Sequence, residues 1–407
     1  MLALLIAFAL PVPWIVLNAA GFHGDPLLVA VLTGLAILGA AFFLSWAAEV
    51  LQKDVSQALA LTLLALIAIL PEYAVDAVFA YEAGRDPSVA QLGYAVANMT
   101  GANRLLVGLG WSSIILFAWL RYRARAVALE RSASVEMTLL LVASVYGLTI
   151  PIKGELNLLD TMILVPLFAL YAFMASRAPA EEPDLEGPAK VIGRQPVSTR
   201  RAIVLAMFVF AAYVIFIAAR PFAHGLVETG LSYGVDEFLL VQWLAPLASE
   251  APEFTVALLF VARRQAAAGM RTLVSSLVNQ WTLLVATLPV VFSLGAERLA
   301  GMQLVSRQGT EIWLTAAQSF YAIVLISDFN LSRKEGLGLF IPFALQVMLP
   351  SEFRPLFTAG YILAGALLLL DPTRRNAIAA WPRYLRTSLR GQPSAGVPAS
   401  PTGESVV

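Results

Sequence analysis

The segments LPEYAVD (Leu70–Asp76) and SEAPEF (Ser249–Phe254) each place a Pro-Glu pair inside a long apolar run, with a second carboxylate beside it. A carboxylate near the middle of a membrane costs several kcal/mol, roughly 2.5 to 3.5 on insertion scales. Two matched segments that both bear this cost predict a functional cause. A bound cation is the simplest one, because it offsets the negative charge.

The composition predicts an all-α polytopic membrane protein. Of the 407 residues, 59% are hydrophobic and 13% are charged, whereas about a quarter of the residues in soluble domains are charged. The formal net charge is +0, so no basic field suggests nucleic acid as a partner. The high apolar content instead predicts that the chain is surrounded by the lipid bilayer. The chain has no cysteine, which excludes disulfides and thiolate metal sites. Its two histidines, His23 and His224, fall between predicted spans.

Hydropathy predicts about twelve helices that span the bilayer, each of roughly 20 residues. Their approximate ranges are 1–20, 26–46, 56–82, 88–119, 135–152, 157–175, 201–219, 234–262, 271–294, 310–327, 336–349 and 355–371. The span at 336–349 is the shortest. The N-terminal apolar stretch lacks the basic start of a signal peptide, so we expect it to be a retained helix.

Basic residues predict the orientation of the chain. Loops after even-numbered spans and the C-terminal tail carry 20 of the 27 Lys and Arg residues, and loops after odd-numbered spans carry six. By the positive-inside rule both termini are cytoplasmic, and in a bacterium the membrane would be the inner one. The span with Glu72 then runs outward and the span with Glu253 runs inward. The two Pro-Glu segments therefore lie in halves of inverted topology.

This orientation predicts four parts of the chain. They are an N-terminal membrane half at 1–175, a cytoplasmic linker at 176–200, a C-terminal membrane half at 201–372 and a cytoplasmic tail at 373–407. The linker is rich in proline and charge, and we expect it to be disordered. In each half a second helix, rich in small and amide residues, follows the Pro-Glu helix, at 93–110 and at 273–285. Interrupted helices in matching positions of two halves predict a midplane site with alternating access.

The residue types in these helices suit a hard cation. Pro71 and Pro252 are predicted to interrupt their helices, because proline cannot donate a backbone hydrogen bond and so frees a carbonyl one turn earlier. Carboxylates three or four residues apart lie on one helical face. Ca²⁺ and Na⁺ prefer oxygen ligands, and a carboxylate that binds a metal ion can instead hold a proton. The predicted ion-binding residues are Glu72, Asp76, Asn98, Asn103, Ser249, Glu250, Glu253, Asn279 and Thr282.

A Pro-Glu pair in an apolar span, followed by a helix of small residues and asparagine, resembles the paired alpha repeats of the sodium/calcium exchanger superfamily of cation antiporters. The resemblance covers about 56–120 and 235–294. It implies that Glu72 and Glu253 are the central metal ligands and that Asn279 and Thr282 occupy the place of the second repeat's asparagine pair. It also implies a secondary active antiporter that exchanges Ca²⁺ against Na⁺ or H⁺ and needs no cofactor.

The chain departs from the family pattern at several positions. Ile67, Ala68 and Ile69 replace small polar residues, and Glu250 stands where a serine is expected. Arg104 lies inside a predicted span, where its charge needs a partner. We expect that partner to be one of the four carboxylates Glu72, Asp76, Glu250 and Glu253, so that Arg104 compensates charge and tunes ion selectivity. The alternative is a structural ion pair outside the cavity.

Other functions and roles remain open at this point. A sodium/proton exchanger on the same fold is the nearest alternative, followed by a channel and by an intramembrane hydrolase with paired carboxylates. The asparagines Asn98, Asn103 and Asn279 can also serve as hydrogen-bond contacts between helices. Acidic residues near span ends are expected to be solvated or to cap helices; they are Asp236, Glu237, Glu311 and Asp328. The oligomeric state stays open.

Overall fold

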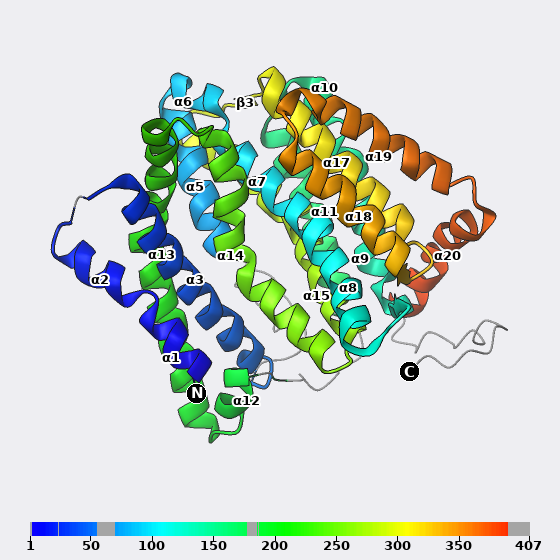
Figure 1. The fold of residues 1–407 in the computed structure, drawn as a ribbon, viewed down its shortest axis with the longest axis horizontal. Coiled ribbons are helices and arrows are strands. Elements are labelled where there is room, and N and C mark those ends of the chain that lie inside the picture. The colour runs from blue at the N-terminus through cyan, green and yellow to red at the C-terminus, as the bar shows by residue number, and fades with distance from the viewer. Residues whose placement is uncertain (1, 23, 55–69, 177–184, 186, 390–407) are drawn as a thin grey trace.

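The computed structural model describes residues 2–22, 24–54, 70–176, 185 and 187–389, and Figure 1 shows a bundle of helices that runs through them. His23, most of the linker, the first part of the span at 56–82 and the end of the tail lie outside the described residues. The helices before the linker are α1 (Leu2–Ala9), α2 (Val12–Ala19), α3 (Pro26–Leu51), α5 (Leu70–Arg85), α6 (Pro87–Leu92), α7 (Tyr94–Leu105), α8 (Ser112–Tyr122), α9 (Ser134–Gly147), α10 (Ile150–Lys153) and α11 (Leu158–Ala175).

The second half of the chain is also helical. Its helices are α12 (Gly187–Gly193), α13 (Val197–Tyr233), α14 (Glu237–Ala262), α15 (Ala266–Asn279), α16 (Val285–Gly295), α17 (Ser306–Leu325), α18 (Arg333–Met348), α19 (Arg354–Leu368) and α20 (Pro372–Leu389). The strands are β1 (Ala126–Ala128), β2 (Glu155–Leu156), β3 (Met302–Gln303) and β4 (Asn330–Ser332). The all-α polytopic fold is confirmed, and every predicted span coincides with a described helix or run of helices over at least part of its length.

Eight helices of the described chain are long and apolar enough to cross a membrane, or nine if the bent pair Ser351–Leu368 and Pro372–Arg386 forms one span. The predicted span at 56–82 is only partly described, and three other predicted spans fail this test for physical reasons. Helix α17 is long enough but carries buried polar residues, and α18 and α19 have only 16 and 15 residues. These helices are held by packing against neighbours and not by apolarity alone.

The predicted span at 1–20 corresponds to the candidate span Leu2–Ala19, in which a turn at Leu10 and Pro11 separates α1 from α2. Other predicted boundaries were wrong. Helix α13 continues to Tyr233, so His224 lies within a helix and not between spans. The expected disorder of the linker is wrong for Gly187–Gly193, because α12 buries Ala189 and Ile192 and packs against α3.

The two halves exchange partners around a pseudo-twofold arrangement. Helix α5 packs against α16 of the other half, and reciprocally α14 packs against α7. Helices α3 and α13, one from each half, form the most extensive helix pair in the described chain and lie together at one side of the bundle (Figure 1). Strand β1 pairs with β4 and β2 with β3, both antiparallel, so each small sheet also joins the two halves.

The helices rich in small and amide residues are irregular at matching positions. Helix α7 passes through a π-helical segment, η1 (Leu106–Trp111), into α8, and α15 passes through η3 (Gln280–Leu284) into α16. Such π segments often occur at functional sites. Gly101 lets α7 approach α14 closely, because a Cβ atom there would lie 1.7 Å from the carbonyl oxygen of Gln242.

Candidate functional site

Four carboxylates from two helices gather inside the bundle. Glu72 and Asp76 lie on α5, and Glu250 and Glu253 lie on α14. The side chains of Glu72 and Asp76 are 1% exposed and that of Glu250 is 2% exposed, whereas Glu253 is half-buried. Their spacing of four and three residues places each pair on one face of its helix. Helix α5 belongs to the first half of the chain and α14 to the second, so each half supplies one carboxylate pair. The two helices are in contact.

Gln280 connects the two helices through one amide group. Its Nε2 atom donates to Oε2 of Glu72 at 3.1 Å and to Oε1 of Glu250 at 2.5 Å. Gln280 is fully buried and begins the π segment η3. It was not among the predicted ligands, although an amide directly after Asn279 in a helix that faces the Pro-Glu segments was a usable signal.

Asn98 plays the corresponding part in the first half. Its Nδ2 atom donates to Oδ1 of Asp76 at 2.9 Å, and both residues are 1% exposed. Asn98 lies on α7, which follows the Pro-Glu helix as α15 does in the second half. Each half therefore supplies one amide to the buried carboxylates.

The remaining predicted ligands are buried, and three of them donate hydrogen bonds within their own helices. Asn103, Thr282 and Ser249 each donate to the carbonyl four residues earlier, at 2.9, 2.6 and 3.3 Å. Asn279 is 2% exposed and directly precedes Gln280. Because a hydroxyl or amide that donates in this way still has acceptor lone pairs, the oxygens of Asn103, Thr282 and Ser249 remain able to accept a hydrogen bond or to bind a cation.

Buried oxygen atoms that receive no hydrogen bond mark the centre of the site. Within the described ranges they include Glu72 Oε1, Asp76 Oδ2, Asn98 Oδ1, Glu250 Oε2, Glu253 Oε2 and Gln280 Oε1. A buried acceptor without a donor costs about 1–3 kcal/mol, and a charged one costs more. Protons or a cation would remove this cost, and hard cations bind oxygen ligands of these types.

The carboxylates alone do not form a metal cage. In the part of the chain that the structure describes, no three acidic or histidine side chains are close enough to hold a metal ion. The amides of Asn98 and Gln280 present their nitrogen atoms to the carboxylates. Rotation of an amide by half a turn exchanges its nitrogen for its oxygen. The site can therefore change from donors that satisfy the carboxylates to oxygens that join them around an ion.

Of the two prolines predicted to interrupt helices, Pro252 has its preceding turn within the described chain and Pro71 does not. Pro252 was expected to interrupt its helix, but it lies inside the continuous helix α14. The missing N–H leaves the carbonyl of Ala248 without its usual donor, although the neighbouring hydrogen bonds and packing keep the helix intact. Pro71 is the second described residue of α5, and the residues before Leu70 lie outside the described chain.

Arg104 does not pair with the four carboxylates, so that expectation was wrong. Its Nη2 atom lies 2.7 Å from Oε2 of Glu311, and its guanidinium group lies over the ring of Trp243. Six residues separate it from Asn98, which turns its side chain about 240° around α7 and toward α17. Glu311 is 1% exposed, so the solvated role expected for it was also wrong.

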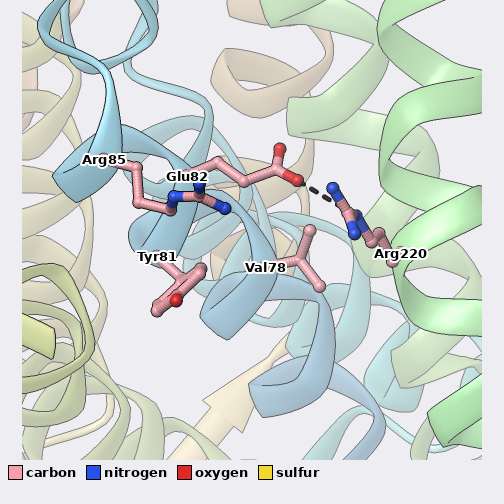
Figure 2. A pocket seen from close by; sticks show the side chains of 5 residues that line it. All are labelled: Val78, Tyr81, Glu82, Arg85 and Arg220. Carbon is pink, nitrogen blue, oxygen red and sulfur yellow. Dashed lines mark ion pairs between the residues drawn. The ribbon is translucent and has the colours of Figure 1, made fainter. Parts of the chain in front are cut away.

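A separate cavity of about 220 Å³ lies between α5 and α13. Figure 2 shows its lining residues and the ion pair across it; they are Val78, Tyr81, Glu82, Arg85 and Arg220. Oε1 of Glu82 lies 3.4 Å from Nε of Arg220 and 2.7 Å from Nε2 of His224. Glu82 follows Glu72 by ten residues, about 15 Å along the helix. This cavity is therefore distinct from the carboxylate site.

The family model described as sodium/calcium exchanger protein matches residues 26–177 and 203–351, which include both Pro-Glu helices and their partners. The chain belongs to the sodium/calcium exchanger family. The resemblance inferred from the alpha repeats is thereby confirmed. As a member of this family the protein is a multi-pass membrane cation antiporter and not an enzyme, which sets aside the hydrolase alternative.

Several solved structures are similar to this exchanger in sequence and in fold. It is 39% identical to the structure titled H+/Ca2+ exchanger CAX, with a TM-score of 0.90 over 95% of this chain and 98% of that one. It is also similar to native YfkE (15% identity, TM-score 0.58, 88% and 99% covered). The sodium-calcium exchanger NCX_Mj gives 13% identity and a TM-score of 0.52, with 80% and 97% covered. The last two similarities show the shared fold. No curated protein sequence gives a significant match.

Proposed function

We propose that this exchanger transports Ca²⁺ in exchange for protons through the site of Glu72, Asp76, Glu250 and Glu253. The observation that carries the proposal is the group of buried oxygen atoms without donors around these carboxylates. The identity of 39% to a structure titled as an H+/Ca2+ exchanger supports the choice of ions. Glu72 and Glu253 are the central metal ligands in this proposal.

Competition for the same oxygens couples the two ions. A carboxylate must lose its proton before it can bind a metal ion, so metal binding releases protons and protonation releases the metal. Four carboxylates carry more charge than one Ca²⁺ neutralises, and the amides of Gln280 and Asn98 are placed to satisfy those that do not bind the ion. Each ion thus leaves when the other arrives, which is the requirement for exchange.

The site is built from both halves, as alternating access requires. Each half contributes one Pro-Glu helix and one amide-bearing helix, and the halves have inverted topology. We propose both termini to be cytoplasmic, with membrane halves at 1–175 and 201–372 that meet at this site. A sodium ion could take the place of the proton on the same fold, and the experiment below separates the two.

Transport assays in proteoliposomes test the proposal. The purified exchanger is reconstituted with a fluorescent Ca²⁺ indicator inside, and a pH gradient or a Na⁺ gradient is applied separately. We expect the pH gradient to drive Ca²⁺ flux in the wild type. Flux driven by Na⁺ and indifferent to pH would assign Na⁺ as the counter-ion and contradict proton exchange. Flux of Na⁺ against protons without Ca²⁺ would support the sodium/proton alternative.

The substitutions Glu72→Gln and Glu253→Gln locate the site in the same assay. Each keeps the side-chain shape and removes the charge, so we expect flux to fall on the order of a hundredfold or more, the scale of losing a buried charged ligand. Glu352→Gln is the matched control, because Glu352 is exposed near the start of α19. Near-normal flux in both site variants, at equal reconstitution, would refute the site.

A further inference from the structure

A second buried charge cluster lies beside the carboxylate site and contains more positive than negative charge. Glu311 forms ion pairs with two arginines: its Oε2 lies 2.7 Å from Nη2 of Arg104, and its Oε1 lies 3.2 Å from Nε of Arg354. The three side chains are 0%, 1% and 2% exposed. Among the described residues, neither arginine has a second carboxylate partner. The cluster therefore carries a formal charge of +1 in the interior.

The structure holds this charge in place through several helices. Arg104 comes from α7, Glu311 from α17 and Arg354 from the first residue of α19. Gln242 of α14 donates to Oε2 of Glu311 and to Oγ1 of Thr100, both at 3.2 Å. Burial of an unbalanced charge costs several kcal/mol. A neutral pair would anchor α19 more cheaply, so the second arginine calls for a function.

The cluster is close enough to act on the ion site through space. Gln242, which contacts the cluster, precedes Glu250 by eight residues on α14, about 12 Å along the helix. Thr100, which contacts Gln242, follows Asn98 by two residues on α7, and Asn98 bonds to Asp76. Two helices thus connect the cluster to the carboxylates, and on α14 the rotation of about 80° between Gln242 and Glu250 leaves both residues toward the same side.

We propose that the surplus positive charge of Arg104, Glu311 and Arg354 sets how strongly the exchanger binds divalent relative to monovalent cations. The inference rests on the proposed cation site. If the axial separation of about 12 Å is taken as the distance between the charges, a unit charge in a medium of effective dielectric constant about 20 changes the affinity for a monovalent cation by about tenfold and for a divalent cation by about a hundredfold. The surplus charge weakens divalent binding, which lets a captured Ca²⁺ leave.

A series of variants changes the charge in single steps. Arg354→Met leaves the neutral pair Arg104–Glu311, Glu311→Gln raises the surplus to +2, and the double variant returns it to +1 with different contacts. Arg354→Lys keeps the charge and is the matched control. Binding of Ca²⁺ and of Sr²⁺ is measured by titration calorimetry on purified exchanger, at an alkaline pH where the wild-type Kd no longer changes with pH. Competition by NaCl reports the monovalent ion.

We expect Arg354→Met to tighten Ca²⁺ and Sr²⁺ binding by similar factors of about a hundred and Na⁺ competition by about ten. Arg354→Lys and the double variant should remain near the wild type, and Glu311→Gln should bind more weakly. An unchanged Kd in Arg354→Met, or a double variant worse than either single one, would overturn the inference; if Glu311→Gln does not fold, the Met and Lys variants still decide. A wild type without binding that depends on Glu72 would overturn this inference and the proposed function together.

Discussion

Asn98 donates a hydrogen bond to Asp76 between α7 and α5, with 2.9 Å between Nδ2 and Oδ1. The bond satisfies only one oxygen of the carboxylate and leaves Oδ1 of Asn98 without a donor. The pair is therefore half satisfied inside the protein. The two oxygens that receive no hydrogen bond, Oδ2 of Asp76 and Oδ1 of Asn98, are available to a proton or a cation.

Replacing Asn98 with Ala should weaken Ca²⁺ transport. The variant removes a donor from Asp76 and an oxygen from the site, a loss of about 1–3 kcal/mol or roughly 5- to 150-fold. The apparent KM for Ca²⁺ in proteoliposomes measures it. Asn103→Ala is the control, because that amide bonds within its own helix. Equal losses in both variants would contradict the role of Asn98.

Replacing Gln280 with Asn should separate Glu72 from Glu250. The shorter side chain keeps the amide but cannot reach both carboxylates, so we expect about a tenfold rise in the KM for Ca²⁺, the scale of one lost hydrogen bond to a charged group. Gln303→Asn on strand β3 serves as the control, since Gln303 is exposed and its amide donates to Glu155, away from the four carboxylates. A normal KM in Gln280→Asn would show that the bridge is dispensable.

Replacing Gly101 with Ala should destabilise the exchanger by at least about 1–3 kcal/mol, the usual cost of overpacking. The new methyl group would lie 1.7 Å from the carbonyl oxygen of Gln242, so α7 and α14 must move apart. Thermal unfolding in detergent measures the effect. Gly360→Ala on α19 is the control, because nothing lies within 4 Å of the added atom. The idea fails if both variants unfold at the same temperature.

The link between Asp54 and Arg200 should depend on pH. Arg200 donates to both carboxylate oxygens at 2.7 and 2.6 Å, and these bonds hold the pKa of Asp54 below its usual value of 3.8. Because the folded pKa is lowered, the stabilisation is present above the unfolded pKa and is lost as the pH falls through the folded value. Asp54→Asn should therefore lower the free energy of unfolding at pH 7 by up to about 1 kcal/mol, which a lower Tm would report. The effect should be smaller near pH 3. An equal effect at both pH values would argue against the charge.

Cysteines at the two ends of α13 test the orientation. The chain has no cysteine of its own, and Ser198 and Ser232 are exposed. If the termini are cytoplasmic, an impermeant thiol reagent added to intact cells should label Ser232→Cys and not Ser198→Cys. Permeabilised cells, in which both should react, provide the control. The reverse pattern would invert the proposed topology.

The sequence was sufficient for the helices and for the carboxylates because both leave a strong local signal. A glutamate inside an apolar run is improbable without a function, and Glu72 and Glu250 do come together although 178 positions separate them. Hydropathy likewise located α3 and α14. It underestimated α13, because Arg220 and His224 interrupt the apolar run while the helix continues.

The partners of the buried polar groups could not be predicted from spacing. Which way Arg104 points depends on its rotation around α7 and on the position of Glu311, more than 200 residues away in the chain. Gln280 lies at the start of η3 and contacts carboxylates 208 and 30 positions away in the chain, which sequence spacing does not reveal. Disorder was wrongly expected for α12, because proline and small residues become structural once α3 offers them a surface to cover.

The two small sheets restrict how this exchanger can move. Strand β1 pairs with β4 and strand β2 with β3, so backbone hydrogen bonds join the two halves in two places. In the second half, α17 separates the two strands that make these contacts. We expect these contacts to oppose a rigid-body separation of the two halves. Helices α3 and α13 take no part in the small sheets, pack mainly against each other and also contact α5 and α14. Access to the ion should therefore alternate by sliding of this helix pair across a fixed centre.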